Sequence, residues 1–290
     1  MKSGIVAVYG RANAGKSTLI NRCLGFKLLA VSSKPQTTRD NIHAIYNDED
    51  SQIVFTDSPG VFRPHGKLGS ILLRDAESAK DGADVIAYVV DAKEVPDFSL
   101  CEKLKSEKVP IILCFNKVDL VHANIGEERL NRYLCNLPKN TEVVRMSCKD
   151  GFGVDTFLSI VKKYLPEGEP IYPRDMVSDR PKEYVIAEMI REKCLRLLKA
   201  EVPHSIYIDV RQIDSEDKGW TVYADIIVEK ESEKAIVIGR NGKMISKIRQ
   251  YSEQSIASYF GLKTIVDLHV KCIPNWREQD RYLRQFGYES

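Results

Sequence analysis

A glycine-rich stretch close to the amino terminus has the residue types and spacing of a phosphate-binding loop. Residues 10–17 read GRANAGKS and fit the pattern G-x-x-x-x-G-K-[ST]. Glycines at these positions let successive backbone N–H groups turn toward one polyphosphate, and the dipole of a following helix favours the anion. We expect Lys16 to reach the β- and γ-phosphates and Ser17 to offer its hydroxyl to Mg²⁺. The residues expected around the phosphates are Gly10, Arg11, Ala12, Asn13, Ala14, Gly15, Lys16, Ser17 and Thr18.

An acidic motif follows further along the chain. Asp57-Ser58-Pro59-Gly60 comes directly after an apolar stretch, residues 52–56, that predicts a strand. A carboxylate at the carboxyl end of a strand beside a phosphate loop is where a Walker-B acid holds the metal, usually through water. We therefore expect Asp57 to be a second Mg²⁺ contact. Gly60 has no Cβ, so it is expected to bring its N–H to the γ-phosphate. An ordinary turn is the alternative for this motif taken alone.

A third motif predicts which base is bound. Asn116-Lys117-Val118-Asp119 follows the apolar residues 109–115. The carboxylate of Asp119 can accept two hydrogen bonds from guanine N1–H and N2–H₂, whereas adenine presents no such pair of donors. Asn116 is expected to tie loops together and touch the base edge, with the stem of Lys117 over the ring. Residues 142–146 predict another strand, and the backbone N–H groups after it are expected to bind guanine O6, at Ser147, Cys148 and Lys149.

These motifs need a scaffold that brings strand ends together. The apolar residues 5–9 precede the phosphate loop and residues 18–24 read as a helix, which is the context that such a loop requires. Strand and helix signals then alternate as far as residue 165, which predicts a doubly wound, mostly parallel α/β sheet with its ligand at the carboxyl ends of the strands. Further strands are expected at 43–46, paired with 52–56, and at 84–91, and further helices at 67–79, 98–106 and 154–165.

A second domain follows a segment rich in Pro and Gly. Residues 165–173 cannot continue a helix, so we divide the chain into a domain over 1–165, a linker over 166–180 and a domain over 181–290. A long amphipathic helix is expected to begin at Pro181. Strands are then expected at 205–213, 220–228 and 264–273, with the apolar residues 234–238 and a helix from residue 243 between the last two.

The second domain contains a G-x-x-G loop between an apolar approach and a helix. This order of elements predicts an α+β KH domain of type II, whose glycine loop clamps about four nucleotides of single-stranded RNA by their backbone. Nearby cations would neutralise phosphates. The candidate RNA-binding residues are Gly239, Arg240, Asn241, Gly242, Lys243 and Lys247. For the basic and aromatic residues 276–288, two interpretations stay open: an RNA contact, or a capping helix packed on the KH sheet.

Composition limits the class of protein. A chain of 290 residues that is 43% hydrophobic and 29% charged is typical of a globular protein with two domains, and no apolar run is long enough to cross a bilayer. The first strand starts at once, without a leader, so we expect a cytosolic protein. The seven cysteines form no C-x-x-C pair, and we expect neither a zinc site nor disulfides. The net charge of +2 decides nothing by itself.

Taken together, the motifs resemble the Era family within the TrmE–Era–EngA-like GTPases. The resemblance rests on GRANAGKS, PQTTRD (residues 35–40), DSPG, NKVD, SCK (147–149) and GRNGKMISKI, and covers essentially the whole chain. It places Thr38 on Mg²⁺ and the γ-phosphate, and it makes Lys16, Thr38 and Gly60 the catalytic set. Ser58 stands where Thr is usual, and Cys148 where Ala is usual; both replacements are small.

The resemblance also implies an activity and partners. It implies a GTP-binding switch that binds 16S rRNA near its 3′ end, assembles the small ribosomal subunit, works as a monomer and contacts the bacterial inner membrane peripherally. Val61 stands where Ras-type switches carry a water-orienting glutamine, so we expect hydrolysis of GTP to GDP to be slow without a partner. Asn13 matches an asparagine that coordinates K⁺ in related GTPases, which makes K⁺ a hypothesis. The alternatives are a tRNA-modification-type GTPase and an RNA-binding module with a vestigial nucleotide site.

Overall fold

The computed structural model describes residues 1–32, 34, 37–62, 64–96, 98–199, 202–216 and 219–288. The chain divides into two units. The first comprises Met1–Leu28, Thr38–Arg63 and Leu72–Asp179, and the second comprises Leu29–Thr37, Pro64–Ile71 and Arg180–Ser290. The second unit therefore contains two short segments from the amino-terminal half of the chain.

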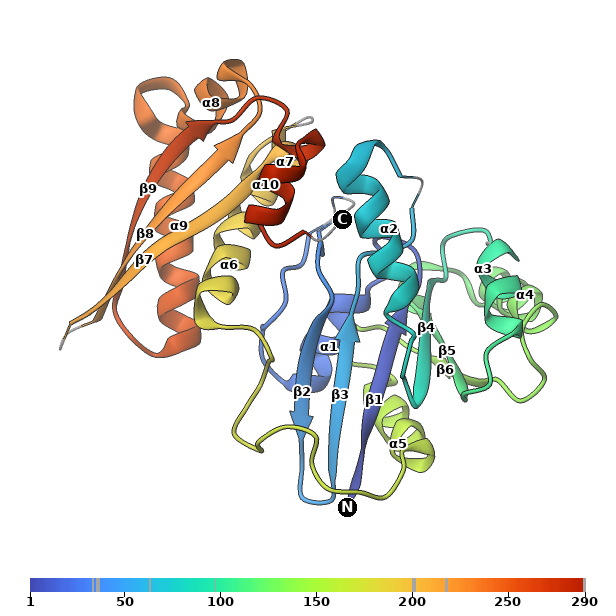
Figure 1. Ribbon diagram of the computed structural model, residues 1–290. Coiled ribbons are helices and arrows are strands. Elements are labelled where there is room, and N and C mark those ends of the chain that lie inside the picture. The colour runs from blue at the N-terminus through green and yellow to red at the C-terminus, as the bar shows by residue number, and fades with distance from the viewer. Residues whose placement is uncertain are drawn as a thin grey trace. The chain divides into compact units, whose positions relative to one another are not determined.

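A mostly parallel sheet forms the centre of the first unit. Its order is β2-β3-β1-β4-β5-β6, with β2 antiparallel to β3 and the other neighbours parallel. Figure 1 shows β1 between β3 and β4. The predicted doubly wound α/β sheet is confirmed. The strands are β1 (Lys2–Tyr9), β2 (Ile42–Asn47), β3 (Ser51–Asp57), β4 (Val85–Asp91), β5 (Ile111–Asn116) and β6 (Glu142–Arg145).

Helices follow these strands in turn. They are α1 (Lys16–Leu24), α2 (Gly66–Ser78), α3 (Phe98–Lys105), η1 (Val118–Leu120), α4 (Ala123–Leu134) and α5 (Val154–Tyr164). Leu104 of α3 and Tyr133 of α4 pack with Tyr88 of β4 in one core cluster. Phe157 of α5 stacks on Phe55 of β3, with 6.2 Å between ring centroids. The strands β3, β4 and β5 are buried at every position, which explains the nearly unbroken apolar sequences of β4 and β5.

The predicted linker runs along the edge of the first unit. The N–H of Ser3 donates to the carbonyl of Pro166 at 3.0 Å, and the N–H of Ile45 donates to that of Val177 at 3.0 Å. The side chain of Gln52 donates to the carbonyl of Tyr172 at 2.8 Å and accepts from its N–H at 2.9 Å. Several backbone groups of residues 166–179 are therefore hydrogen-bonded to this unit.

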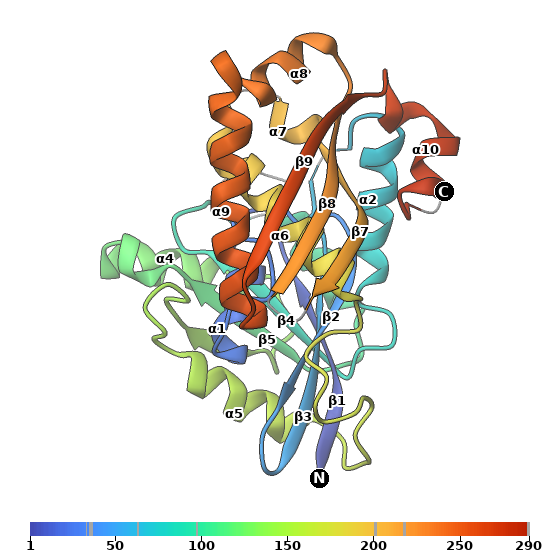
Figure 2. The same ribbon diagram turned by 90° about the vertical axis from the view of Figure 1, so that its left-hand side faces the viewer.

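The second unit is built on a three-stranded sheet. Its order is β7-β8-β9, with β7 antiparallel and β9 parallel to β8 (Figure 2). Each strand contributes buried apolar residues to the core, such as Ile208, Ala224 and Val266. The predicted α+β KH domain is confirmed. Its elements are α6 (Lys182–Leu197), α7 (Val202–Ser205), β7 (Tyr207–Glu216), β8 (Gly219–Val228), α8 (Glu231–Ile238), η2 (Arg240–Gly242), α9 (Lys243–Phe260), β9 (Thr264–Cys272), η3 (Trp276–Glu278) and α10 (Asp280–Gln285).

The aromatic residues near the carboxyl end belong to the core of the second unit. Trp276 is fully buried, and its indole N–H donates to the carbonyl of Ser205 at 2.9 Å. Phe286 stacks on Tyr207 with ring centroids 4.0 Å apart. Tyr288 also lies against Trp276. Of the two interpretations for residues 276–288, packing within the domain accounts for these rings.

Among the described residues, no helix is both long enough and apolar enough to cross a bilayer.

Candidate functional site

The phosphate loop joins β1 to α1 in a backbone conformation that needs its glycines. Gly10 has φ +147° and Gly15 has φ +107°. A Cβ on Gly10 would lie 2.2 Å from the carbonyl oxygen of Val89, and one on Gly15 would lie 2.2 Å from Nδ2 of Asn116. Neither position accepts a side chain. The loop is therefore held against the ends of neighbouring strands.

Lys16 lies inside this loop. Its ammonium donates to the carbonyls of Gly10 at 3.2 Å and of Arg11 at 3.1 Å, and only 6% of its surface is exposed. Burial lowers the pKa of Lys16 from its ordinary value to about 8, and the Asp57 carboxylate opposes part of that shift. A buried cation whose hydrogen bonds go to carbonyl groups is suited to receive an anion.

Two hydroxyl groups and a carboxylate converge beside Lys16. The Ser17 hydroxyl donates to Oδ2 of Asp57 at 2.7 Å, and the Thr38 hydroxyl donates to the same oxygen at 3.1 Å. The two hydroxyl oxygens are themselves 3.1 Å apart. Asp57 is fully buried. Mg²⁺ prefers hard oxygen ligands and is usually held by one or two carboxylates together with substrate phosphates, so this set fits that ion.

The acidic motif lies directly on the phosphate loop. A Cβ on Gly60 would lie 2.4 Å from the Cα of Ala12, so only glycine lets these backbones approach. The N–H of Val61 donates to the carbonyl of Gly10 at 3.1 Å, and the Ser58 hydroxyl donates to the carbonyl of Val8 at 3.3 Å. The DSPG segment thus packs directly against the phosphate loop.

Of the segment 35–40, Pro35 and Gln36 lie outside the described residues.

Asn116 connects the loops around the expected base site. Its Nδ2 donates to the carbonyl of Ala14 at 2.9 Å, and its Oδ1 accepts from the N–H of Cys148 at 3.0 Å. The tie between loops expected of Asn116 is therefore present. Because the Cys148 N–H already has an acceptor, a bond from it to guanine O6 would have to share that hydrogen.

The ammonium group of Lys117 contacts both the phosphate loop and the end of β4. Its Nζ donates to the carbonyl of Asn13 at 2.8 Å and forms an ion pair with Oδ2 of Asp91 at 2.6 Å. Lys117 and Asn13 both have φ +64°, a conformation that non-glycine residues rarely adopt. Asp91 ends β4 and also accepts from the N–H of Lys93 at 2.8 Å. Sequence reasoning missed Asp91, because no local pattern pairs this carboxylate with Lys117, 26 residues further along the chain.

Arg22 of α1 is a second residue that sequence reasoning missed. Its Nε donates to the carbonyl of Cys148 at 3.0 Å, and its guanidinium also donates to the carbonyl of Lys149. The expected base loop is therefore fixed to the helix that follows the phosphate loop. Ser147 closes this loop by donating from its hydroxyl to Asp150 at 2.9 Å. Asp119 lies in the η1 turn after β5.

The G-x-x-G loop of the second unit links α8 to α9. Gly239 and Gly242 both have φ +72°, and Asn241 has φ +54°. A Cβ on Gly239 would lie 2.6 Å from the Cβ of Met244, so the loop leaves no room for a side chain there. The cations expected to meet phosphates, Arg240, Lys243 and Lys247, are exposed.

The apolar approach to this loop is helical. Residues 234–238 fall within α8, whose first turn carries Glu231 and Glu233. Carboxylates at a helix N-terminus are a sequence signal for such a helix.

Comparisons with known proteins agree with this geometry. Residues 5–117 match the family model described as 50S ribosome-binding GTPase, and residues 201–277 match the KH domain model. Among solved structures, a variant of Aquifex aeolicus Era bound to GDP and AlF₄⁻ is 34% identical, with a TM-score of 0.95 and full coverage of both chains. The complex of Era with MgGDPNP and nucleotides 1506–1542 of 16S ribosomal RNA gives the same identity, TM-score and coverage.

Curated relatives match over the same extent. GTPase Era of Clostridium tetani is 40% identical over 293 aligned positions, which cover 100% of this chain and 99% of that protein. GTPase Era of Staphylococcus haemolyticus is 40% identical over 291 positions, which cover 99% of this chain and 97% of that protein. The chain belongs to the Era family of GTPases.

Proposed function

We propose that this chain is a GTP-hydrolysing switch that binds the 3′ end of small-subunit ribosomal RNA and acts in assembly of that subunit. The proposal of GTP binding rests mainly on one observation. Side-chain oxygens of Ser17, Thr38 and Asp57 lie within 3.1 Å of one another, beside the buried ammonium of Lys16. This arrangement suits a metal-bound triphosphate, because Mg²⁺ is usually held by a carboxylate together with phosphate and other hard oxygen ligands.

The nucleotide is bound by groups from several strand ends. Lys16 and the loop N–H groups receive the phosphates, and the Asp119 carboxylate selects guanine by accepting hydrogen bonds from N1–H and N2–H₂ of the base. Ser17, Thr38 and Asp57 would hold Mg²⁺, which neutralises charge on the β- and γ-phosphate oxygens when bound. The family resemblance supports these roles, together with those of the remaining residues of the phosphate loop, of Ser58, Pro59 and Gly60, and of Asn116, Lys117, Ser147, Cys148 and Lys149.

Hydrolysis without a partner is expected to be slow. The side chain of Val61 cannot orient a water molecule, so the unassisted rate of GTP hydrolysis should be ~10⁻⁴–10⁻² s⁻¹. We also propose that Asn13 takes part in binding K⁺, which would supply positive charge near the transferred phosphate. Faster hydrolysis in KCl than in NaCl supports this role, and equal rates in the two salts remove it.

The RNA half of the proposal rests on the KH domain and on the relatives. The solved Era complex contains 16S ribosomal RNA nucleotides 1506–1542. In this chain the G-x-x-G loop presents the exposed cations Arg240, Lys243 and Lys247 beside a backbone that would clamp RNA phosphates. Gly239 and Asn241 complete the loop with left-handed conformations.

Two segments of the second unit support a link between nucleotide and RNA. Arg191 of α6 is only 2% exposed, and its guanidinium donates to the carbonyl of Thr37, the residue before Thr38. Arg196 donates to the carbonyl of Val31 at 3.3 Å. A change at Thr38 that depends on the γ-phosphate would thus act on residues that contact α6.

Crosslinking tests the RNA half. RNA bound in cell lysate is compared between the unaltered chain and Gly239→Asp, which places a carboxylate where no side chain fits. Loss of small-subunit RNA supports the KH loop as the RNA site, and an unchanged set of RNAs places recognition elsewhere.

Single-turnover hydrolysis with and without RNA tests the switch. Release of phosphate that RNA accelerates supports a switch. No release under either condition would favour an RNA-binding module with a vestigial nucleotide site. The KH domain over residues 201–277 favours the Era type over the tRNA-modification type.

Location and oligomeric state rest on family resemblance alone. We infer a cytoplasmic monomer that makes peripheral contact with the inner membrane. Sedimentation of the full chain and co-flotation with vesicles of bacterial lipid test these points; a sedimenting dimer or the absence of co-flotation would contradict them.

A further inference from the structure

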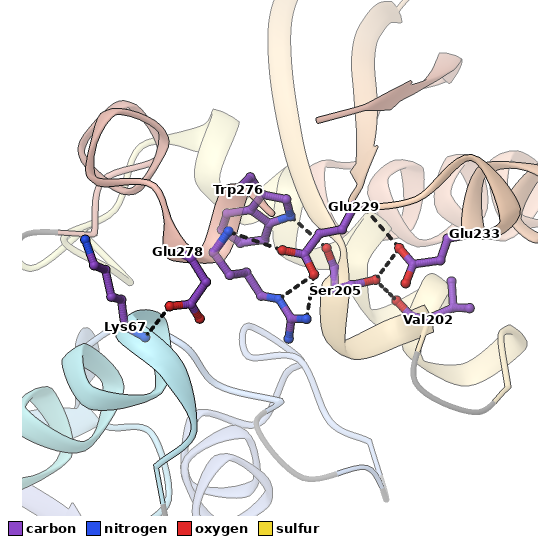
Figure 3. A network of polar contacts seen from close by, with 8 residues as sticks. Lys67, Val202, Ser205, Glu229, Glu233, Trp276 and Glu278 are labelled. Carbon is purple, nitrogen blue, oxygen red and sulfur yellow. Dashed lines mark hydrogen bonds and ion pairs between the residues drawn. The ribbon is translucent and has the colours of Figure 1, made fainter. Parts of the chain in front are cut away.

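The first turn of α2 receives a carboxylate from the carboxyl end of the chain. The backbone N–H of Lys67 donates to Oε2 of Glu278 at 3.2 Å, a contact drawn in Figure 3. A Cβ on Gly66 would lie 2.0 Å from Oε1 of the same carboxylate. Both sides of this contact lie in the second unit. The first N–H groups of a helix have no partner within the helix, so Glu278 supplies a cap to α2.

The turn that carries Glu278 is fixed to the KH core. Its first residue, Trp276, is fully buried and donates to the carbonyl of Ser205. Arg277 donates from its backbone N–H and from its guanidinium to Glu229, with the shortest contact at 2.6 Å. Glu229 is itself only 8% exposed. The backbone before Glu278 therefore has little freedom to follow α2 if that helix moves.

A second carboxylate completes the same network. Glu233 accepts from the Ser205 hydroxyl at 2.9 Å and from the N–H of Glu229 at 3.0 Å. Figure 3 shows Ser205 between Trp276 and Glu233. This network links α8, the helix that leads into the G-x-x-G loop, with the turn that carries Glu278.

The capped helix α2 lies close in the sequence to the expected γ-phosphate contact. The helix begins at Gly66, shortly after the DSPG segment that ends at Gly60. Contacts between that segment and a γ-phosphate order it in GTPase switches and are lost on hydrolysis. We propose that Glu278 is a positioning residue, which links the nucleotide-dependent position of α2 to the KH domain. The inference rests on the proposed function, because it presupposes that GTP alters RNA binding.

Local stability alone does not distinguish this role from that of a simple cap. The contact between Lys67 and Glu278 is exposed, and loss of a cap lowers the stability of a helix whether or not the cap also positions that helix. A positioning role instead predicts that the bound nucleotide changes the affinity of the chain for RNA. This coupling is reciprocal, and it is measured as the ratio of the dissociation constants for RNA with the two nucleotides.

The experiment uses the full chain and an RNA oligonucleotide with the 3′-end sequence of small-subunit ribosomal RNA. The Kd for this RNA is measured with GDP and with a non-hydrolysable GTP analogue, and the ratio of the two values is compared between variants. Glu278→Ala is expected to reduce the ratio about fivefold toward one, the size expected for loss of one helix cap. Hydrogen exchange of the peptide covering the start of α2 is expected to rise by a similar factor.

Glu253→Ala is the matched control. Glu253 accepts the backbone N–H of Val266 at 3.0 Å, so it offers the same chemistry within the KH domain away from α2. This variant is expected to keep the ratio of the unaltered chain, and thermal unfolding checks that both variants fold. A Glu278→Ala ratio equal to that of the unaltered chain overturns the inference. If the unaltered chain itself gives a ratio of one, the proposed switch fails, before any variant is considered.

Discussion

Asp91 should determine how tightly the chain binds guanine nucleotides, although it is not expected to touch them. It forms an ion pair with Nζ of Lys117 at 2.6 Å, and its side chain is 9% exposed against 30% for that of Lys117. A hydrogen bond to a charged group contributes about 1.5–3 kcal/mol. Because water can partly solvate the exposed lysine, we take the lower end, about 1.5 kcal/mol, which corresponds to roughly tenfold in Kd.

Asp91→Asn isolates this effect, because asparagine keeps an oxygen that can accept from the N–H of Lys93. Calorimetric titration with GDP and Mg²⁺ should give about a tenfold higher Kd for this variant. Glu94→Gln is the matched control: its ion pair with Arg11, at 3.4 Å, is 42–50% exposed and should contribute little. In a double-mutant cycle with Lys117→Ala, the two effects should not add. Additive effects, or an Asp91→Asn affinity within twofold of the unaltered chain, would refute the reasoning.

Further predictions concern the phosphate loop and the KH core. Burial holds the pKa of Lys16 at about 8 in the free protein, and a bound phosphate favours its charged form. Nucleotide binding near pH 9 should therefore take up close to one proton, and binding near pH 6.5 almost none. Calorimetry in buffers of different ionisation enthalpy measures this uptake. A Cβ at Gly60 would lie 2.4 Å from the backbone of Ala12 and should push the DSPG segment away from the phosphate loop. Gly60→Ala should therefore weaken the binding of GTP, which needs both segments, more than that of GDP, and should slow hydrolysis; equal losses for both nucleotides would contradict a γ-phosphate role. Trp276→Phe loses the 2.9 Å hydrogen bond to Ser205 and leaves a cavity, so denaturant titration should show about 2 kcal/mol less stability of the KH domain.

The residues that form sequence motifs could be found without the structure because each motif is local. The phosphate loop, DSPG and NKVD each place their functional groups within a few residues, directly after a strand. Parallel strands then bring their carboxyl ends to one edge of the sheet, whatever the details of side-chain packing. The contact between Ser17 and Asp57 follows from that topology, whereas Thr38, in the loop before the antiparallel strand β2, was expected only from the family resemblance.

The supporting residues could not be found in this way. Asp91 and Lys117 are 26 residues apart, Arg22 and Cys148 are 126 apart, and Lys67 and Glu278 are 211 apart. Nothing in local spacing selects one carboxylate among many as the partner of a given lysine, because such pairs depend on tertiary placement. The hydrogen bond from the Cys148 N–H to the Asn116 side chain also depends on loop geometry, and no sequence pattern predicts it.

Calorimetric titration of the full chain with GTP in the presence of Mg²⁺, repeated with ATP, tests the central claim most directly. We expect saturable heat with one GTP per chain and binding of ATP at least about 100-fold weaker, because adenine offers the Asp119 carboxylate no pair of donors. No heat with GTP, or equal affinity for both nucleotides, would contradict it.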